Sequence, residues 1–196
     1  MNYTNADKIK TILDSYDYDL NAICAILANM YAESALYPDN LQNTYNKSFG
    51  ETDASYTKKI NNGTISKNQF AHDRAGYGLC QWTYHTRKNN LYEYATNHGK
   101  TIDDMSTQIA FMIEELCNDF KSIENTLRNS NIGIDYKTEL FMRKFESPAD
   151  CSPQAIAKRC TYAHKYHDYF KSNTKRKKTG IVTIDSVTYR YTIVEV

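Results

Sequence analysis

Residues 20–33 read LNAICAILANMYAE, and this stretch decides the fold. Its first part, LNAICAILA, contains a single polar side chain, Asn21, so apolar side chains surround nearly the whole predicted helix. A helix that is apolar on every side belongs in the centre of a domain. Pro38 follows closely and prevents the helix from continuing. The sequence therefore predicts a buried central helix that ends in a carboxylate, Glu33.

Further helices are predicted around this central one, so the expected fold class is mainly α (α+β). Residues 105–120 have the clearest amphipathic pattern, with apolar side chains repeating at helical spacing. Ser152 and Pro153 supply an N-cap and a first-turn proline for a last helix that extends to about residue 170. Residues 38–65 show no helical period and are rich in polar and turn-forming residues, which predicts a long surface loop.

The end of the chain differs in composition from the rest. A basic run, KRKK, occupies residues 175–178, and the residues after it alternate as strands do, with a turn near 185–186. We therefore predict a helical domain over residues 1–172 and a basic linker with a small β-hairpin over residues 173–196. Because a lone hairpin is marginally stable in water, this segment is expected to be an attachment or oligomerisation element.

Composition argues against several classes of protein. The net charge is +1, so no overall positive field favours nucleic acid, and no apolar run approaches the ~20 residues that cross a membrane. The five cysteines are odd in number and form no CxxC pair, which predicts reduced thiols and no metal site or cofactor. The first ten residues, MNYTNADKIK, lack the apolar core of a signal peptide. We expect a protein made in the bacterial cytoplasm.

Glu33 is the first candidate catalytic residue. Burial of a carboxylate and the negative end of a helix dipole both disfavour the charged form, so this position is expected to raise the pKa of Glu33. A carboxylic acid that is still protonated near neutral pH is what glycoside hydrolysis needs, because the leaving oxygen must receive a proton. The alternative is a structural glutamate at a helix end, partly exposed or paired with a lysine.

A second group of candidates lies in residues 76–82, GYGLCQW. Glycines allow a backbone to approach a ligand closely, aromatic faces stack on sugar rings, and an amide can bind hydroxyl or N-acetyl groups. Tyr77, Gln81 and Trp82 are therefore candidate substrate-binding residues. The alternative is that Trp82 anchors the loop in the core. Tyr166, on the last predicted helix, is a further candidate whose alternative role is also in the core.

Two aspartates could complete a pair of catalytic carboxyl groups. Asp73 lies just before the 76–82 loop, and Asp53 lies in the predicted long loop. In a glycosidase pair, one carboxyl group protonates the leaving oxygen while the other activates water or stabilises the cationic transition state. Either aspartate could take the second role.

These residues resemble the phage tail-type lysozyme family, which is related to goose-type lysozymes and soluble lytic transglycosylases. The resemblance covers residues 23–170 and includes NMYAES at 29–34, GYGLCQWT at 76–83 and FESPAD at 145–150. It implies a lysozyme-like helical fold, with Glu33 as the general acid and a glycan cleft lined by the 76–82 loop. It implies no particular second carboxylate, because related enzymes can work with a single glutamate.

The resemblance also implies an activity and a setting. Such enzymes are N-acetylmuramidases, which cleave the β-1,4 bond between N-acetylmuramic acid and N-acetylglucosamine in peptidoglycan, or lytic transglycosylases, which form anhydro-muramic products. The expected partners are peptidoglycan glycan strands and, through residues 173–196, other phage or tailocin tail proteins. We expect the protein to act at the cell wall as a virion or tail component, or as a released bacteriolytic lysin.

Two other classes of function fit parts of the sequence. Cys80, with His85, His164 or His167, could form a cysteine peptidase or amidase that acts on wall peptides. That mechanism requires a thiolate within hydrogen-bond reach of a histidine. Alternatively, the domain could be a tail component that binds glycan without catalysis.

Overall fold

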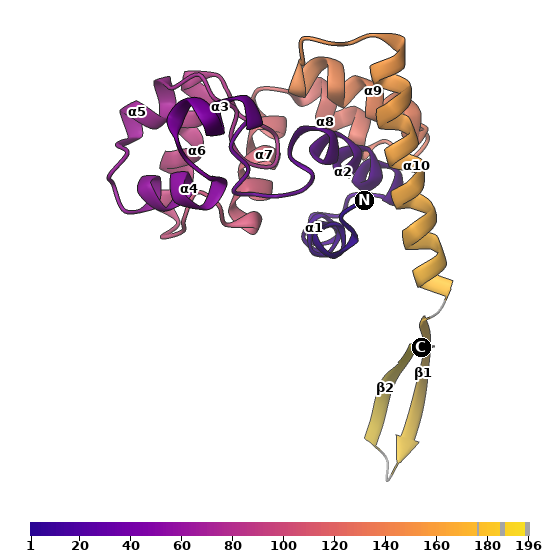
Figure 1. Cartoon of the computed structure of the whole chain (residues 1–196). Coiled ribbons are helices and arrows are strands. Elements are labelled where there is room, and N and C mark those ends of the chain that lie inside the picture. Colours follow the sequence, from indigo (N-terminus) through magenta and orange to yellow (C-terminus); the bar gives the residue numbers. More distant parts are fainter. Residues whose placement is uncertain (176, 185–186, 195–196) are drawn as a thin grey trace.

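The computed structural model describes residues 1–175, 177–184 and 187–194, with side chains described through residue 173. Helices form most of it, and the predicted mainly α fold is confirmed (Figure 1). Its elements are α1 (Tyr3–Ser15), α2 (Leu20–Ser34), α3 (Asn43–Phe49), α4 (Asp53–Asn61), α5 (Lys67–His72), α6 (His85–Asn97), α7 (Met105–Asn118), α8 (Lys121–Arg128), α9 (Ile134–Phe141), the π-helical turn η1 (Met142–Glu146), α10 (Pro153–Lys175), β1 (Lys177–Ile184) and β2 (Val187–Val194).

Helix α2 is the predicted buried central helix. The Asp19 side chain caps its start by accepting a hydrogen bond from the Ala22 amide at 2.7 Å. Residues 22–30 are buried without interruption, and α1, α9 and α10 all pack against the helix. Ala35 adopts a left-handed conformation, with φ of 51°, and ends the helix three residues before Pro38. Glu33 therefore lies in the last turn, where the chain leaves the core.

The helices form two groups joined by α7. Figure 1 shows α3, α4, α5 and α6 together on one side, and α1, α2, α8, α9 and α10 on the other. Helix α7 contacts α6 in the first group and both α1 and α8 in the second. Its apolar stripe, predicted from the sequence, is buried on both sides of this junction. The two groups therefore share one hydrophobic core, and the surface between them can form a cleft.

The expectation of a long loop over residues 38–65 was wrong. Most of this segment folds as α3 and α4. The Thr52 side chain accepts a hydrogen bond from the Ser55 amide, and the Ser55 hydroxyl accepts one from the Thr52 amide, so the start of α4 is fixed by a capping box. Tyr56 and Ile60 then bury their side chains one helical turn apart. Local capping and two buried side chains outweigh the polar composition.

The C-terminal segment forms the strands that its alternating pattern predicts. Helix α10 continues to Lys175, so the basic run begins within the helix. Strands β1 and β2 pair antiparallel, from Lys177 opposite Val194 to Ile184 opposite Val187. The turn predicted at 185–186 lies outside the described residues. In Figure 1 the strands extend beyond the end of α10, away from the two helix groups.

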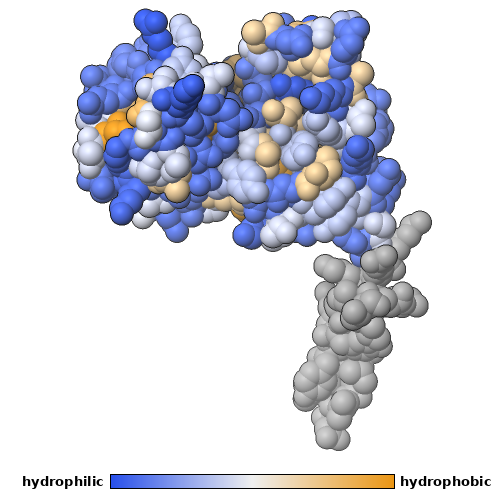
Figure 2. Space-filling view, in the orientation of Figure 1, coloured by the Kyte–Doolittle hydropathy of each residue, from blue (hydrophilic) through white to orange (hydrophobic). Residues whose placement is uncertain are grey.

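The surface of the helical part is mostly polar. Figure 2 shows hydrophilic residues over most of the visible face, with apolar residues in small scattered groups. Within the described part of the chain, no helix combines the length and apolar character needed to span a bilayer. The face in this view therefore offers no large apolar patch of the kind that marks an obligate interface.

Candidate active site

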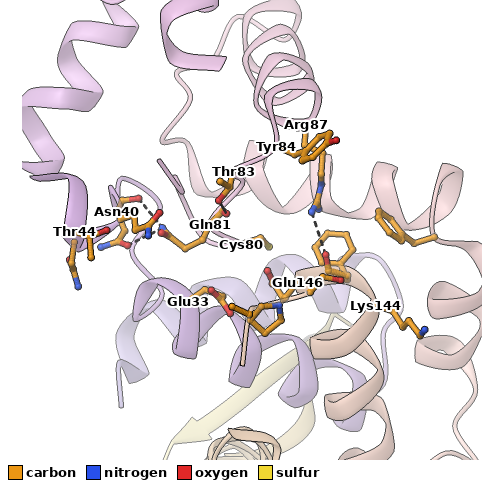
Figure 3. Close-up of a pocket in the computed structure, with 17 residues that line it drawn as sticks. Glu33, Asn40, Thr44, Cys80, Gln81, Thr83, Tyr84, Arg87, Lys144 and Glu146 are labelled. Carbon is orange, nitrogen blue, oxygen red and sulfur yellow. Dashed lines mark hydrogen bonds between the residues drawn. The ribbon is translucent and has the colours of Figure 1, made fainter. Parts of the chain in front are cut away.

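A cleft of 730 Å³ lies between the two helix groups. From the group of α3–α6, the cleft is lined by Asn40, Gln42, Asn43, Thr44, Cys80, Gln81, Thr83, Tyr84 and Arg87. Glu33 and residues 144–149 line it from the group of α2 and α9. Figure 3 shows Gln81 and Cys80 on one side and Glu33 and Glu146 on the other. The cleft is large enough to accept part of an extended polymer, and its walls carry polar and charged side chains.

Glu33 lies at the edge of this cleft and is held by Arg159 of α10. Its side chain is 19% exposed, and a guanidinium nitrogen of Arg159 donates a hydrogen bond to its Oε1. Arg159 also donates to the Asn29 side-chain oxygen at 2.9 Å, so its own position is fixed from α2. A buried cation therefore fixes the orientation of the Glu33 carboxyl group.

Glu146 is a second carboxyl group in the same cleft. It is the last residue of η1, and its Oε1 is sealed from solvent with no hydrogen-bond partner among the described residues. Burial raises the pKa of Glu146 well above its ordinary range, and the negative charge of Glu33 raises it further. The cleft thus contains two carboxyl groups in different surroundings. That of Glu33 is paired with a cation, and that of Glu146 has one buried oxygen without a hydrogen-bond partner among the described residues.

The loop of residues 76–83 is built on a tight turn. The backbones of Tyr77 and Trp82 exchange hydrogen bonds at 3.2 and 3.0 Å, and Gly78 between them has φ of 77°. A Cβ atom on Gly78 would also meet the Gln108 side chain at 2.7 Å, so only glycine fits there. The Ser34 hydroxyl donates to the Leu79 carbonyl at 3.0 Å, which ties this loop to α2 beside Glu33.

Comparison with known proteins agrees with this geometry. A model of the phage tail lysozyme family matches residues 4–170. The chain belongs to this family. It is also 25% identical over 187 residues to Morphogenesis protein 1 of Bacillus phage B103, a match that covers 90% of this chain and 41% of that protein. The chain thus spans less than half the length of that curated relative. The resemblance to this family seen in the sequence is confirmed.

Of the four residues predicted to bind substrate, Gln81 alone lines the cleft of this tail lysozyme. Gln81 Nε2 donates to the side-chain oxygen of Asn40 at 2.9 Å, which joins the two segments of one wall (Figure 3). Its φ of 46° is uncommon for a residue with a side chain. This strained position directs the Gln81 amide along the cleft wall, where it can meet a ligand.

The three aromatic candidates lie in the core and do not line the cleft. Tyr77, Trp82 and Tyr166 are 0% exposed. The Tyr77 hydroxyl lies 2.8 Å from that of Thr57, and Trp82 Nε1 donates to Glu115 at 2.9 Å. Their aromatic faces pack against protein, which leaves no surface for a sugar. The alternative interpretation of Trp82 and Tyr166, as anchors in the core, agrees with the structure.

The two predicted second carboxylates also lie outside the cleft. Asp73 accepts hydrogen bonds from the Lys88 ammonium, the Tyr56 hydroxyl and the Ala75 amide, so it neutralises a buried cation. Asp53, the first residue of α4, accepts from the Asn46 side chain and the Leu41 amide and holds the loop before α3. The structure does not bring either aspartate together with Glu33. The carboxyl group that lines the cleft with Glu33 is Glu146.

A cysteine peptidase centre is not assembled here. Burial raises the pKa of the Cys80 thiol well above its ordinary range, whereas a nucleophilic cysteine needs a lowered one. His85 stacks on His72, His164 lies 2.8 Å from Asp135, and no histidine lines the cleft among the described residues. The described residues also contain no cluster of metal-ligating side chains.

Sequence reasoning assigned no role to Glu146 or Arg159. Arg159 lies on the last predicted helix and Glu146 follows a short apolar segment, and each contacts Glu33 or its surroundings across more than a hundred residues of chain. The sequence pattern of α2 showed that Glu33 lies at the end of this helix. It could not show which charges from α10 and η1 surround that side chain. One signal was that the FESPAD segment, which contains Glu146, formed part of the family resemblance.

The different positions of Tyr77 and Gln81 lead to a prediction. Tyr77→Phe removes a buried hydroxyl and its partner's hydrogen bond, so the free energy of unfolding is expected to fall by about 1 kcal/mol while KM for peptidoglycan stays unchanged. Gln81→Ala is expected to raise KM several-fold with a smaller loss of stability. Urea unfolding and wall-digestion kinetics on both variants check this. A raised KM for Tyr77→Phe would contradict the assignment of Tyr77 to the core.

Proposed function

We propose that this protein cleaves the β-1,4 bond between N-acetylmuramic acid and N-acetylglucosamine in peptidoglycan, with Glu33 as the general acid. The observation that carries this proposal is the position of Glu33. It ends the buried helix α2, and its partly exposed carboxyl group lines a 730 Å³ cleft opposite Gln81. Membership of the phage tail lysozyme family supports the same class of reaction.

The reaction can proceed with Glu33 as the only group that gives and takes the proton. A glycan in the cleft covers the exposed part of the Glu33 carboxyl group and excludes water from it. Glu33 gives its proton to the glycosidic oxygen, the bond to the muramic C1 breaks through an oxocarbenium-like state, and the N-acetylglucosamine side leaves with a free hydroxyl. Arg159 then stabilises the resulting carboxylate through the ion pair seen here.

Two endings of the reaction are consistent with this arrangement. The Glu33 carboxylate can take a proton from a water molecule that attacks C1, which gives hydrolysis. It can instead take the proton of the muramic 6-hydroxyl, which attacks C1 and forms an anhydro-sugar. Either step returns Glu33 to its protonated form, so the cycle closes without a second carboxylate.

Product analysis tests this proposal. Purified peptidoglycan is digested with the protein, and the soluble fragments are examined by mass spectrometry. Hydrolysis gives reducing muramic ends, and transglycosylation gives fragments lighter by one water. Fragments cut only within the peptide stems would contradict the proposed bond and would point to a peptidase or amidase.

We also propose that the protein acts at the cell wall as part of a phage tail, held there by residues 173–196. Its relative in phage B103 is named as a morphogenesis protein, and strands β1 and β2 extend beyond the helical part. Removal of residues 173–196 is expected to abolish incorporation into tail particles and to leave the rate of wall digestion unchanged. Particles that still contain the shortened chain would contradict this role.

A further inference from the structure

We propose that Glu146 acts as a neutral carboxylic acid that positions the glycan beside Glu33, by donating a hydrogen bond to an acceptor oxygen of the bound N-acetylated sugar. This inference rests on the proposed function, because it takes peptidoglycan sugar as the ligand of the cleft. It assigns a role to a residue for which the sequence predicted none. In Figure 3, Glu146 lies near Glu33 and Cys80 in the wall of the cleft.

The backbone places Glu146 in the cleft by an unusual turn. After α9, residues 142–146 wind as a π-helix, and the Ser147 amide donates to the Met142 carbonyl at 2.8 Å. Ser147 itself is left-handed, with φ of 48°. Single π-turns are rare and occur frequently at functional sites, because they redirect a side chain that a regular helix would place elsewhere. Since α9 packs against α2, this turn brings Glu146 to the wall that carries Glu33.

The hydrogen bonding of Glu146 favours its neutral form. Its Oε1 is buried and has no partner among the described residues. The donor that faces Glu146 is the weak Cys80 thiol, whose hydrogen bond lowers the pKa of Glu146 less than burial raises it. An ionised carboxylate in that position is therefore more costly than a neutral acid. In the neutral acid, Oε1 can be the carbonyl oxygen, and the proton resides on Oε2. The partly exposed Glu146 then presents an O–H donor to a ligand in the cleft.

The cations near Glu146 do not reverse this preference, because each is bound to another carboxylate. Arg87 of α6 binds Glu115 through two hydrogen bonds of 2.6 and 2.8 Å. Arg159 of α10 binds Glu33 of α2. The Cys80 thiol, which also faces Glu146, is uncharged, because burial raises its pKa.

On the same element as Glu146, the exposed Lys144 also lines the cleft. The charges that face Glu146 from the packed elements are therefore two compensated ion pairs. Burial remains the dominant effect on its protonation.

A neutral donor suits this ligand. The hydroxyl and acetamido groups of the sugars carry acceptor oxygens but no charge, so an O–H group can bind them without a desolvated ion. A second carboxylate would instead place like charge beside Glu33 and repel the acceptor oxygens. Because the acid loses its proton when the pH rises, binding that depends on Glu146 must weaken towards alkaline pH.

Binding of the N-acetylglucosamine trimer to the full chain tests this, by calorimetry from mildly acidic to alkaline pH. Glu146→Gln keeps a neutral donor that cannot ionise, so its affinity is expected to stay within about threefold of the acidic wild-type value at every pH. The wild-type affinity is expected to fall as Glu146 ionises. Glu146→Ala is expected to bind about tenfold more weakly than the acidic wild type, the equivalent of one hydrogen bond. Glu139→Gln, an exposed carboxyl group paired with Arg143, serves as the matched control.

Several results would overturn this inference. If Glu146→Gln loses the alkaline decline and keeps its affinity but no longer cleaves peptidoglycan, Glu146 transfers a proton and is the catalytic acid. If Glu146→Ala binds the trimer as well as wild type, Glu146 does not contact the sugar. A Glu146→Gln variant that keeps the wild-type pH dependence would assign that dependence to another group. Thermal unfolding of each variant shows that these comparisons are made on folded protein.

The same measurements separate this inference from the proposed function. If the wild-type protein binds the trimer with the expected pH dependence but releases no sugar fragments from peptidoglycan, the proposed catalysis fails while the role of Glu146 in binding remains. If it cleaves peptidoglycan and Glu146→Ala affects neither binding nor KM, the catalysis remains and the role of Glu146 fails.

Discussion

Glu33→Gln is expected to lower the rate of peptidoglycan cleavage by about 10²–10⁴-fold, the usual contribution of a general acid. Glutamine keeps the size of the side chain and can still accept a hydrogen bond from Arg159, but it has no proton to transfer. The affinity for the N-acetylglucosamine trimer should therefore change much less than the rate. Release of soluble fragments from purified peptidoglycan, measured beside trimer binding, checks both expectations.

The control for this experiment is Glu139→Gln, the same exchange at an exposed carboxyl group of α9. It is expected to digest peptidoglycan at the wild-type rate, since Glu139 pairs only with Arg143 across one helical turn. Wild-type digestion by Glu33→Gln would show that Glu33 is not the acid. If the wild-type protein itself binds glycan but cleaves none, the cleft belongs to a binding component of the tail rather than to an enzyme.

The central helix and the carboxylate at its end were predictable from the sequence. An unbroken apolar run with a cap at Asp19 and a stop before Pro38 has few alternatives to a buried helix. The return of polar residues after Ala28 and the stop at Pro38 predict that Glu33 lies in the last turn of this helix, where the structure has it. Both conclusions depend only on local sequence, which is why they hold in the structure.

The surroundings of Glu33 were not predictable in the same way. Arg159 reaches it from α10 and Glu146 from η1, and no spacing along the chain indicates that these elements meet at α2. A π-turn also has no clear sequence pattern, so the direction of Glu146 could not be inferred. The positions of the aromatic residues in the 76–83 loop were not predictable for another reason. Apolar side chains in a glycine-containing loop fit a ligand site and a core anchor equally well, and only burial distinguishes Tyr77 and Trp82 from exposed stacking residues.

Asp73→Asn is expected to reduce the free energy of unfolding by about 3–5 kcal/mol, the usual effect of removing one partner from a buried ion pair. Lys88 has a side chain that is 0% exposed, and its ammonium group binds Asp73 and the Ala75 carbonyl. Without Asp73, the charge on Lys88 has no compensating carboxylate. Asp53→Asn is the matched control, since it changes the same group where no cation is buried, and a loss of about 1 kcal/mol is expected there.

The loss of Asp73 is also expected to change how the free energy of unfolding depends on pH, and the direction of this change follows from the pKa of Lys88. Burial lowers the pKa of Lys88 below its ordinary value, while Asp73 raises it, so removing Asp73 lowers it further. The folded Asp73→Asn protein then holds the Lys88 proton less tightly than the unfolded chain does, and its stability must increase as the pH rises towards about 10.4, the ordinary lysine value. Replacing Lys88 with methionine in the Asp73→Asn protein is expected to restore most of the lost stability, because the uncompensated charge is gone.

Urea unfolding at two pH values, combined with the rate of wall digestion per folded molecule, decides whether Asp73 is structural or catalytic. If Asp73 neutralises Lys88 and does nothing else, the folded fraction of Asp73→Asn digests peptidoglycan at the wild-type rate, and so does Asp53→Asn. If Asp73→Asn unfolds at the wild-type urea concentration but loses turnover, the ion pair with Lys88 is not the main role of Asp73. Asp73 would then again be a candidate for the second catalytic carboxylate. The two outcomes differ in both measurements, because a structural ion pair affects the amount of folded protein and a catalytic carboxylate affects the rate of each folded molecule.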